Sequence, residues 1–231
     1  MADKKITALT QGIPVANDVF PYVSSPGASP VTQKTLYDNG GWIGAVGSWT
    51  YASATTITVP SGAATYYAVG DKIKLTQTTV KYFYIVGVAD TLLTITGGTS
   101  YTLTNAVITL PYFSHVVSPV GFPGYFTYSP TITFTAGTSP TTLSTSLYYF
   151  ALSGKVCTVS IYAVYTNAGA TVTAASVPLP INNVNNCAGY GHLGVGVTPN
   201  PTVTDVVSNA FRLTCTSSSA NRLIAGASYF I

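Results

Sequence analysis

The glycine-rich stretch GYGHLGVG is the part of the sequence that most resembles a motif for chemistry. It contains a literal GxGxxG at Gly189, Gly191 and Gly194. A dinucleotide-binding loop of this spacing needs a strand before it and a helix after it, so that the phosphates meet the N-terminus of the helix. Here the residues VTPNP follow, and a helix cannot start there. We therefore predict a flexible loop that joins two strands, and no nucleotide site.

The histidines and carboxylates form no pattern typical of catalysis or metal binding. His115 and His192 lie far apart, with no acidic residue close to either in the sequence, whereas a metal site needs three or four converging ligands. All six acidic residues are scattered aspartates, so no carboxylate pair for sugar hydrolysis is visible. A Ser–His–Asp set has no fixed spacing, but nothing resembles a nucleophile elbow. We expect no enzymatic activity, no metal and no other cofactor.

The basic residues are few and dispersed. The net charge is +3 with nine Lys and Arg, and Lys72, Lys74 and Lys81 form the one local group in the sequence. A nucleic-acid-binding surface would need a denser basic patch interleaved with aromatic residues. We therefore predict that these lysines lie on a solvated strand face, and that nucleic acid is not a partner.

Low charge is the most informative bulk property. Only 6% of the residues are charged and 47% are hydrophobic, whereas a typical soluble domain has roughly 25% charged residues. Residues 91–154 contain no Lys, Arg, Asp or Glu. Such a composition favours a protein that is largely covered by other copies of itself or by a larger assembly. A secreted β-protein with a hydroxyl-rich surface is the alternative.

No segment has the pattern of a membrane span or an export signal. The sequence has no apolar run of about 18 residues, and the opening MADKKITAL lacks the apolar core of a signal peptide. We therefore expect no membrane insertion, and assembly in a cytoplasm. Cys157, Cys187 and Cys215 have no CxxC spacing, and we expect free thiols. A disulfide between Cys157 and Cys215 is the alternative.

The residue types indicate an almost all-β protein. Thr and Tyr favour strands, and the chain has 36 Thr and 17 Tyr but no Glu. Turn signals divide it into four predicted segments. These are an N-terminal segment of short strands and a Gly-rich linker (1–50), a small β-barrel or meander (51–110), a Pro-rich connector (111–130), and a jelly-roll-like β-sandwich (131–231).

Alternation of apolar and polar residues predicts which side chains face the cores. In AVGDKIKL, Ile73 and Leu75 should point inward, and Lys72 and Lys74 outward. The stretch KYFYIVGV, residues 81–88, is apolar on both faces and should be a central strand. VPLPINN is predicted to be an edge strand or a loop because of its two prolines. The predicted apolar faces of two later strands are Cys157, Val159, Ile161, Ala163 and Tyr165, and Phe211, Leu213 and Cys215.

The opening of the chain, KITALT…PVANDVFPYVSSPG…TQKTL, resembles a segment found at the N-terminus of bacteriophage tail-fibre and related virion proteins. In those proteins a KI(S/T)ALT strand precedes a D-x-x-P-x-V strand and a K-x-T/I-L strand, which match residues 5–10, 18–23 and 34–36. The stretches GDKIKLTQTTVKYFYIVGV, GFPGYFTYSPTITF and GKVCTVSI, and the final SYFI, are also similar to phage structural proteins. The resemblance implies a virion component and a homotrimer, with an N-terminal attachment piece and a C-terminal β-sandwich. Its mount could be the tail, the neck or the capsid.

Two sets of residues are candidates for binding. The short opening strands cannot build a core of their own, so we expect other virion proteins or neighbouring subunits to cover Ile6, Leu9, Val19, Phe20 and Tyr22. Loops rich in Tyr and Asn can contact a host surface glycan or protein through ring faces and amide hydrogen bonds. The candidate contacts are Tyr165, Asn167, Tyr190, His192 and Asn200, each of which could equally be an ordinary turn residue.

Three functions compete on this evidence. The leading hypothesis is a fibre- or spike-like virion protein that is anchored by its N-terminus and displays the β-sandwich for host attachment. The second is a capsid decoration or other purely structural protein of the neck or head, without receptor binding. The third is an enzyme that degrades host polysaccharide. Each would be a protein of the virion.

Overall fold

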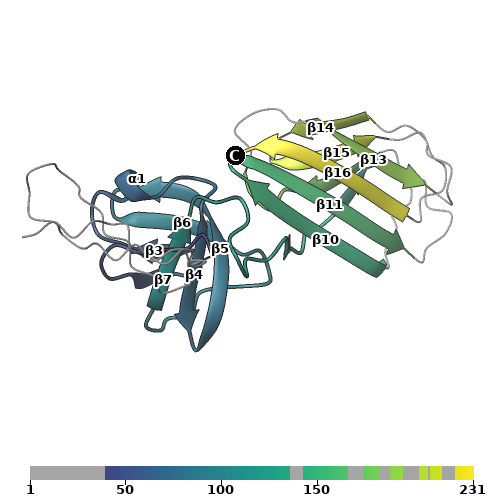
Figure 1. Ribbon diagram of the computed structural model, residues 1–231. Helices are drawn as coiled ribbons and strands as arrows, with labels where there is room; N and C mark the ends of the chain where they lie inside the picture. Colours follow the sequence, from purple (N-terminus) through teal and green to yellow (C-terminus); the bar gives the residue numbers. More distant parts are fainter. Residues whose placement is uncertain are drawn as a thin grey trace, which may run out of the picture.

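The computed structural model describes residues 40–135, 143–165, 174–182, 188–194, 203–207, 209–214 and 222–231. Within these residues the chain forms antiparallel β-sheets and one short helix, so the predicted all-β class is confirmed. Two lobes lie end to end, and we call them the first and the second module (Figure 1). The predicted opening strands lie outside the described residues, as do the candidate attachment residues Ile6, Leu9, Val19, Phe20 and Tyr22.

The first module is one seven-stranded sheet around its own core. Its strands, in hydrogen-bonded order, are β1 (Ile43–Gly44), β7 (Thr109–Ser114), β4 (Lys72–Gln77), β5 (Thr79–Ala89), β6 (Leu92–Thr96), β3 (Thr56–Thr58) and β2 (Thr50–Ser53). A short helix, α1 (Ala63–Tyr66), lies between β3 and β4 in the chain. Strands β4, β5 and β6 form the predicted meander. The sheet extends beyond 51–110 on both sides, since β1 precedes this segment and β7 runs into the predicted connector.

Strand β5 is central in this sheet, as predicted, because it serves two cores. Phe83 and Ile85 point into the core of the first module. On the opposite face, Tyr84 is part of the core of the second module, and Tyr82 packs against it. A strand that lies between the cores of both modules must be apolar on both faces, and the sequence KYFYIVGV has this pattern.

The second module contains two sheets that bury one core. The five-stranded sheet has the order β13 (Ala188–Gly194), β16 (Arg222–Phe230), β11 (Val156–Tyr165), β10 (Leu143–Ser153) and β8 (Phe126–Thr127). The four-stranded sheet has the order β14 (Val203–Val207), β15 (Ala210–Thr214), β12 (Ala174–Pro178) and β9 (Thr133–Thr135). Side chains of both sheets share one cluster, in which Phe150 and Ala225 meet Ala175 and Val177. A jelly-roll-like arrangement of these strands stays a prediction.

Local patterns identified the longest hairpin correctly. Strands β10 and β11 pair from Leu143↔Tyr165 to Ser153↔Val156, and turn at Gly154, whose φ is 56°. The predicted inward face of β11 is buried at Cys157, Val159, Ile161 and Ala163. The side chains of Tyr165, Phe211 and Leu213 lie outside the description, as does Cys215.

One prediction about strands is wrong, and another is met only in part. The stretch that contains GxGxxG is not a loop: residues 188–194 form strand β13, paired with β16 from Ala188↔Ser228 to Gly194↔Arg222. Glycines were interpreted as a turn signal, but here they lie on a sheet edge. The stretch VPLPINN was predicted to be an edge strand or a loop, and its residues 179–182 lie outside any strand, as a loop would. Its first two residues end β12, which is not an edge strand, because it pairs with β15 on one side and β9 on the other. Pro178 is its last residue, beyond the end of β9, so the missing N–H breaks no ladder.

The Pro-rich connector forms the joint between the modules. The ring of Phe126 contacts those of Tyr84, at 5.2 Å between centroids, and of Phe150, at 5.9 Å. Phe122 also lies 5.0 Å from Tyr84. The backbone N–H of Thr99 donates to the carbonyl of Thr127, at 2.7 Å. The connector is therefore a packed aromatic layer, in which rings from both modules interlock.

Candidate functional site

The charged side chains of the first module turn inward or onto neighbouring groups. Lys72 is only 2% exposed, so the prediction of a solvated lysine face is wrong. Lys72 pairs in register with Tyr84, and Lys74 with Tyr82, which places both lysines on the face that the joint covers. Burial lowers the pKa of Lys72, an effect that the nearby Asp71 carboxylate opposes. Alternation alone could not reveal this, since it does not show which polar face is covered.

Lys74 lies between two aromatic rings. Its ammonium is 4.8 Å from the ring centroid of Trp42 and 4.6 Å from that of Tyr112. Burial lowers the pKa of Lys74. Trp42 itself is buried, as expected from its type, and its indole N–H donates to the carbonyl of Val120 at 2.8 Å. The predicted Gly-rich linker is therefore fixed to the joint at this point.

The remaining charges of the first module also have partners within the fold. The Lys81 ammonium donates to the carbonyl of Thr102, at 2.7 Å. The Asp90 carboxylate accepts the N–H of Gly62 at the start of α1, at 2.7 Å. These contacts lie at the surface and hold loops in place. They do not form the dense basic patch that nucleic-acid binding requires.

Asp71 and His115 lie within hydrogen-bonding distance of each other, a contact that the sequence did not indicate. Nδ1 of His115 lies 2.9 Å from Oδ1 of Asp71, while Oδ2 of Asp71 accepts the N–H of Ala68. The Asp71 residue is 6% exposed, whereas the His115 side chain is 53% exposed. The two residues meet because β4 and β7 are neighbours in the sheet, which no local spacing could predict. Among the described residues, no group of three His, Cys, Asp or Glu side chains gathers as a metal site would require.

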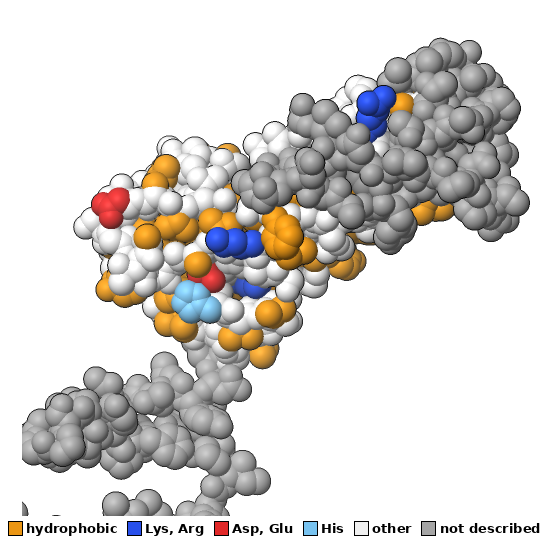
Figure 2. Space-filling view, turned by 90° about the horizontal axis from the view of Figure 1, so that it is seen from above, with side chains coloured by type: hydrophobic (Ala, Val, Ile, Leu, Met, Phe, Trp, Pro, Cys, Tyr) orange, Lys and Arg blue, Asp and Glu red, His pale blue; other side chains and the backbone are white. Residues whose placement is uncertain are grey.

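Several large apolar side chains of the first module are exposed. In β7 and the segments on either side of it, Val107 is 79% exposed, Leu110 66%, Val117 64% and Val120 74%. We call these four residues the apolar surface of the first module. Figure 2 shows one face of this module, with hydrophobic side chains spread between isolated charged ones. Single exposed apolar side chains are common on folded proteins, whereas a contiguous apolar patch marks a surface that another molecule covers.

The structure places the candidate contact residues of the second module only in part. Tyr165 ends β11, at the end of the module away from the joint (Figure 1). Tyr190 and His192 lie within β13, with their backbones opposite Gly226 and Ile224, so the prediction that they belong to a loop is wrong. Their side chains lie outside the description.

Strand registers bring the ends of several strands together at the end of the second module away from the joint. Arg222 pairs with both Val164 and Gly194, and Ala174 pairs with both Thr135 and Thr214. Asn167 and Asn200 lie outside the described residues, in segments that begin and end at these strands. That the five candidate contacts form a binding site therefore stays a prediction.

Comparison with known proteins identifies no relative. No family model matches the chain, and no curated protein or solved structure matches it. In the described part of the chain, no helix has the length and apolarity needed to span a bilayer.

Proposed function

We propose that the chain is a structural protein of a bacteriophage particle, fibre- or spike-like, anchored by its N-terminal segment. The second module would then be displayed for attachment to the host. The other partners in this proposal are further copies of the chain, as a homotrimer, and the virion proteins that carry the mount.

The exposed apolar surface of the first module is the observation that carries the proposal. Val107 and Val120 are more than 70% exposed, although Asp71 and Lys72 of the same module are buried and Lys74 lies between two aromatic rings. A free monomer with such a surface would tend to associate, because each buried Å² of apolar surface is worth about 25 cal/mol. Contact with other copies or with particle proteins would remove this apolar surface from water.

The shape of the molecule favours a fibre over a capsid decoration. The two modules lie end to end, and the aromatic joint holds them together (Figure 1). The far end of the second module collects the ends of strands from both of its sheets, which is where sandwiches carry binding loops. A decoration protein that only reinforces a shell has no need of such a display.

The experiment is to locate labelled protein on intact particles and to count its copies. The proposal predicts label at the tail, neck or a vertex, with a few to a few dozen copies. Hundreds of copies over the shell would identify a capsid decoration instead. Absence of label from purified particles would overturn the proposal altogether.

A truncation separates anchoring from folding. We expect a chain without residues 1–37 to keep its β circular-dichroism signal and its oligomeric state, because Trp42 and both cores remain. It should fail to load onto particles that lack the full-length protein. Loading at normal copy number would place the anchor elsewhere, most plausibly in the first module.

A further inference from the structure

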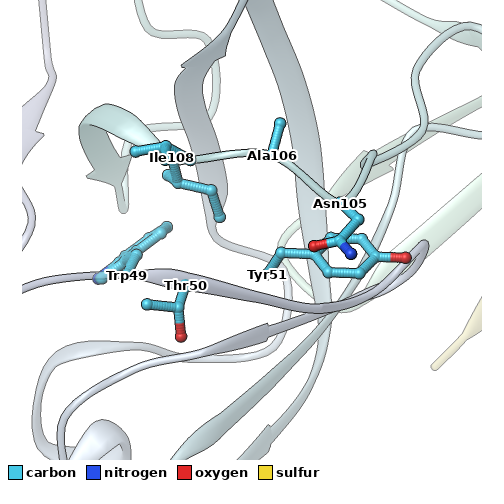
Figure 3. A pocket seen from close by; sticks show the side chains of 7 residues that line it. Trp49, Thr50, Tyr51, Asn105, Ala106 and Ile108 are labelled. Atoms are coloured by element: carbon cyan, nitrogen blue, oxygen red, sulfur yellow. The ribbon is translucent and has the colours of Figure 1, made fainter.

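A pocket of about 380 Å³ lies on the first module, away from the joint. It is formed between β2, with Trp49, Thr50 and Tyr51, and residues 105–108, which lead into β7 (Figure 3). Trp49 and Ile108 are buried in its wall, and Val107 stands exposed beside it. The volume lies in the lower part of the range of roughly 300–1,000 Å³ typical of small-molecule sites.

The pocket is neutral and carries polar groups that are free to bind. None of its lining residues is charged. Among the described residues, no side-chain hydrogen bond joins Thr50, Tyr51 or Asn105 to a partner. In Figure 3 the Asn105 carboxamide projects toward the ring of Tyr51. The lining thus combines ring surface with an amide and hydroxyls.

A buried glutamine holds the loop that carries Asn105. Gln77 is 2% exposed, and its amide N–H groups donate to the carbonyls of Thr104, at 2.9 Å, and Ala106, at 3.0 Å. Its carbonyl oxygen accepts the N–H of Thr104, at 3.1 Å. Asn105 is therefore bracketed by three hydrogen bonds to one side chain. Such support pre-organises a binding site and lowers the entropy lost on binding.

We infer that this pocket binds a neutral saccharide. A pyranose ring offers an apolar C–H face, which packs on an aromatic ring, and hydroxyls, which bond to amide and hydroxyl groups. Tyr51 supplies ring surface, the buried Trp49 forms part of the wall behind it, and Asn105 and Thr50 supply the polar partners. The absence of charge from the lining disfavours phosphate, sulfate and uronic acids, which need cationic partners. The inference does not depend on the proposed place in a virion.

The test is saturation-transfer NMR of the full chain with glucose, galactose, N-acetylglucosamine and their neutral disaccharides. We expect at least one of them to bind with a Kd near the millimolar range, and to change the tryptophan fluorescence. Tyr51→Ala should weaken binding at least tenfold, and Asn105→Ala, on an exposed loop, several-fold. Tyr66→Ala is the matched control, since Tyr66 is a tyrosine of the first module that is 42% exposed, whereas Tyr51 is half-buried, and Tyr66 does not line the pocket.

Two outcomes would overturn the inference. One is that no sugar of the panel binds at tens of millimolar. The other is binding that neither Tyr51→Ala nor Asn105→Ala weakens, or that an apolar peptide displaces, which would identify a protein-docking pocket. Because the assay uses the free protein, a failure to bind sugar would not contradict the proposed location on a particle. Absence of the protein from particles would likewise not contradict sugar binding by this pocket.

Discussion

The two modules share a charge-poor sequence but bury different side chains. The buried polar residues among those described, Asp71, Lys72, Gln77 and Ser114, all belong to the first module. The shared core of the second module contains Cys157 and several tyrosines and no charged group. The first module therefore adds buried polar and charged side chains to its apolar core, whereas the described core of the second module consists of apolar and aromatic packing. A chain with few charged residues can therefore bury some of them inside the fold, as it does with Asp71 and Lys72.

The joint should account for the largest effect on stability. Phe126 is fully buried and contacts rings from both modules. We expect Phe126→Ala to lower the free energy of unfolding by about 3–5 kcal/mol. It should also separate two urea transitions that coincide in the unmodified protein, because the modules then unfold independently.

The chain provides one probe for each module. Both tryptophans, Trp42 and Trp49, lie in the first module, and alkylation of buried Cys157, followed by peptide mapping, reports on the second. Tyr125→Ala is the control, since Tyr125 is 57% exposed and should cost less than about 1 kcal/mol. If Phe126→Ala left the two transitions coincident, the joint would not be what couples the modules.

A glycine at the joint should have the next largest effect. Gly98 has φ +58°, and a Cβ there would collide with the carbonyl oxygen of Thr127. We expect Gly98→Ala to destabilise the protein by about 2–4 kcal/mol, from backbone strain and forced separation of the modules. Gly44→Ala is the control, because a Cβ at Gly44 meets nothing within 4 Å. Equal thermal midpoints for the two variants would contradict the close packing described here.

Alkaline pH should destabilise the second module first. Burial raises the pKa of Cys157 to about 11 and raises those of Tyr128 and Tyr229 as well. A group whose pKa is raised by folding contributes its full stability below its unfolded pKa, near 9.0 for Cys157, and loses it as the pH rises. At about 1.4 kcal/mol per pKa unit, Cys157 alone should cost about 2 kcal/mol by roughly pH 10.5.

The stability of the first module should instead increase as the pH rises. Burial lowers the pKa of Lys72, so the cost of its buried charge falls as the pH rises toward 10.5. Urea titrations at several pH values, followed by tryptophan fluorescence and Cys157 alkylation, distinguish the modules. Cys157→Ala should flatten the alkaline loss of the second module. Loss of stability of the first module at a lower pH than that of the second would contradict this prediction.

Removal of one cation should have the smallest effect. Lys74→Met keeps the length of the side chain but removes the charge between the rings of Trp42 and Tyr112. Such contacts are worth about 0.5–2 kcal/mol, and burial of the charge offsets part of that. We expect a loss of about 1 kcal/mol, with a shift in the Trp42 emission. A gain in stability would show that the cost of desolvation exceeds the attraction.

The sequence predicted what depends on neighbours in the chain. The meander of β4, β5 and β6 and the hairpin at Gly154 follow from alternation and turn residues. It did not predict the burial of Lys72 or the pairing of Asp71 with His115. Those depend on which strands become neighbours and on what covers a face. The pocket also escaped prediction, because β2 and the segment before β7 come together only in the fold.

The mass of the isolated full-length chain in solution tests the central claim most directly. That claim is that the apolar surface of the first module, Val107, Leu110, Val117 and Val120, belongs to an assembly. Multi-angle light scattering at low micromolar concentration should give a trimer, three times the chain mass of 24.0 kDa. A stable species at the mass of one chain would contradict this claim, because the four apolar side chains would then be exposed to solvent in a stable monomer.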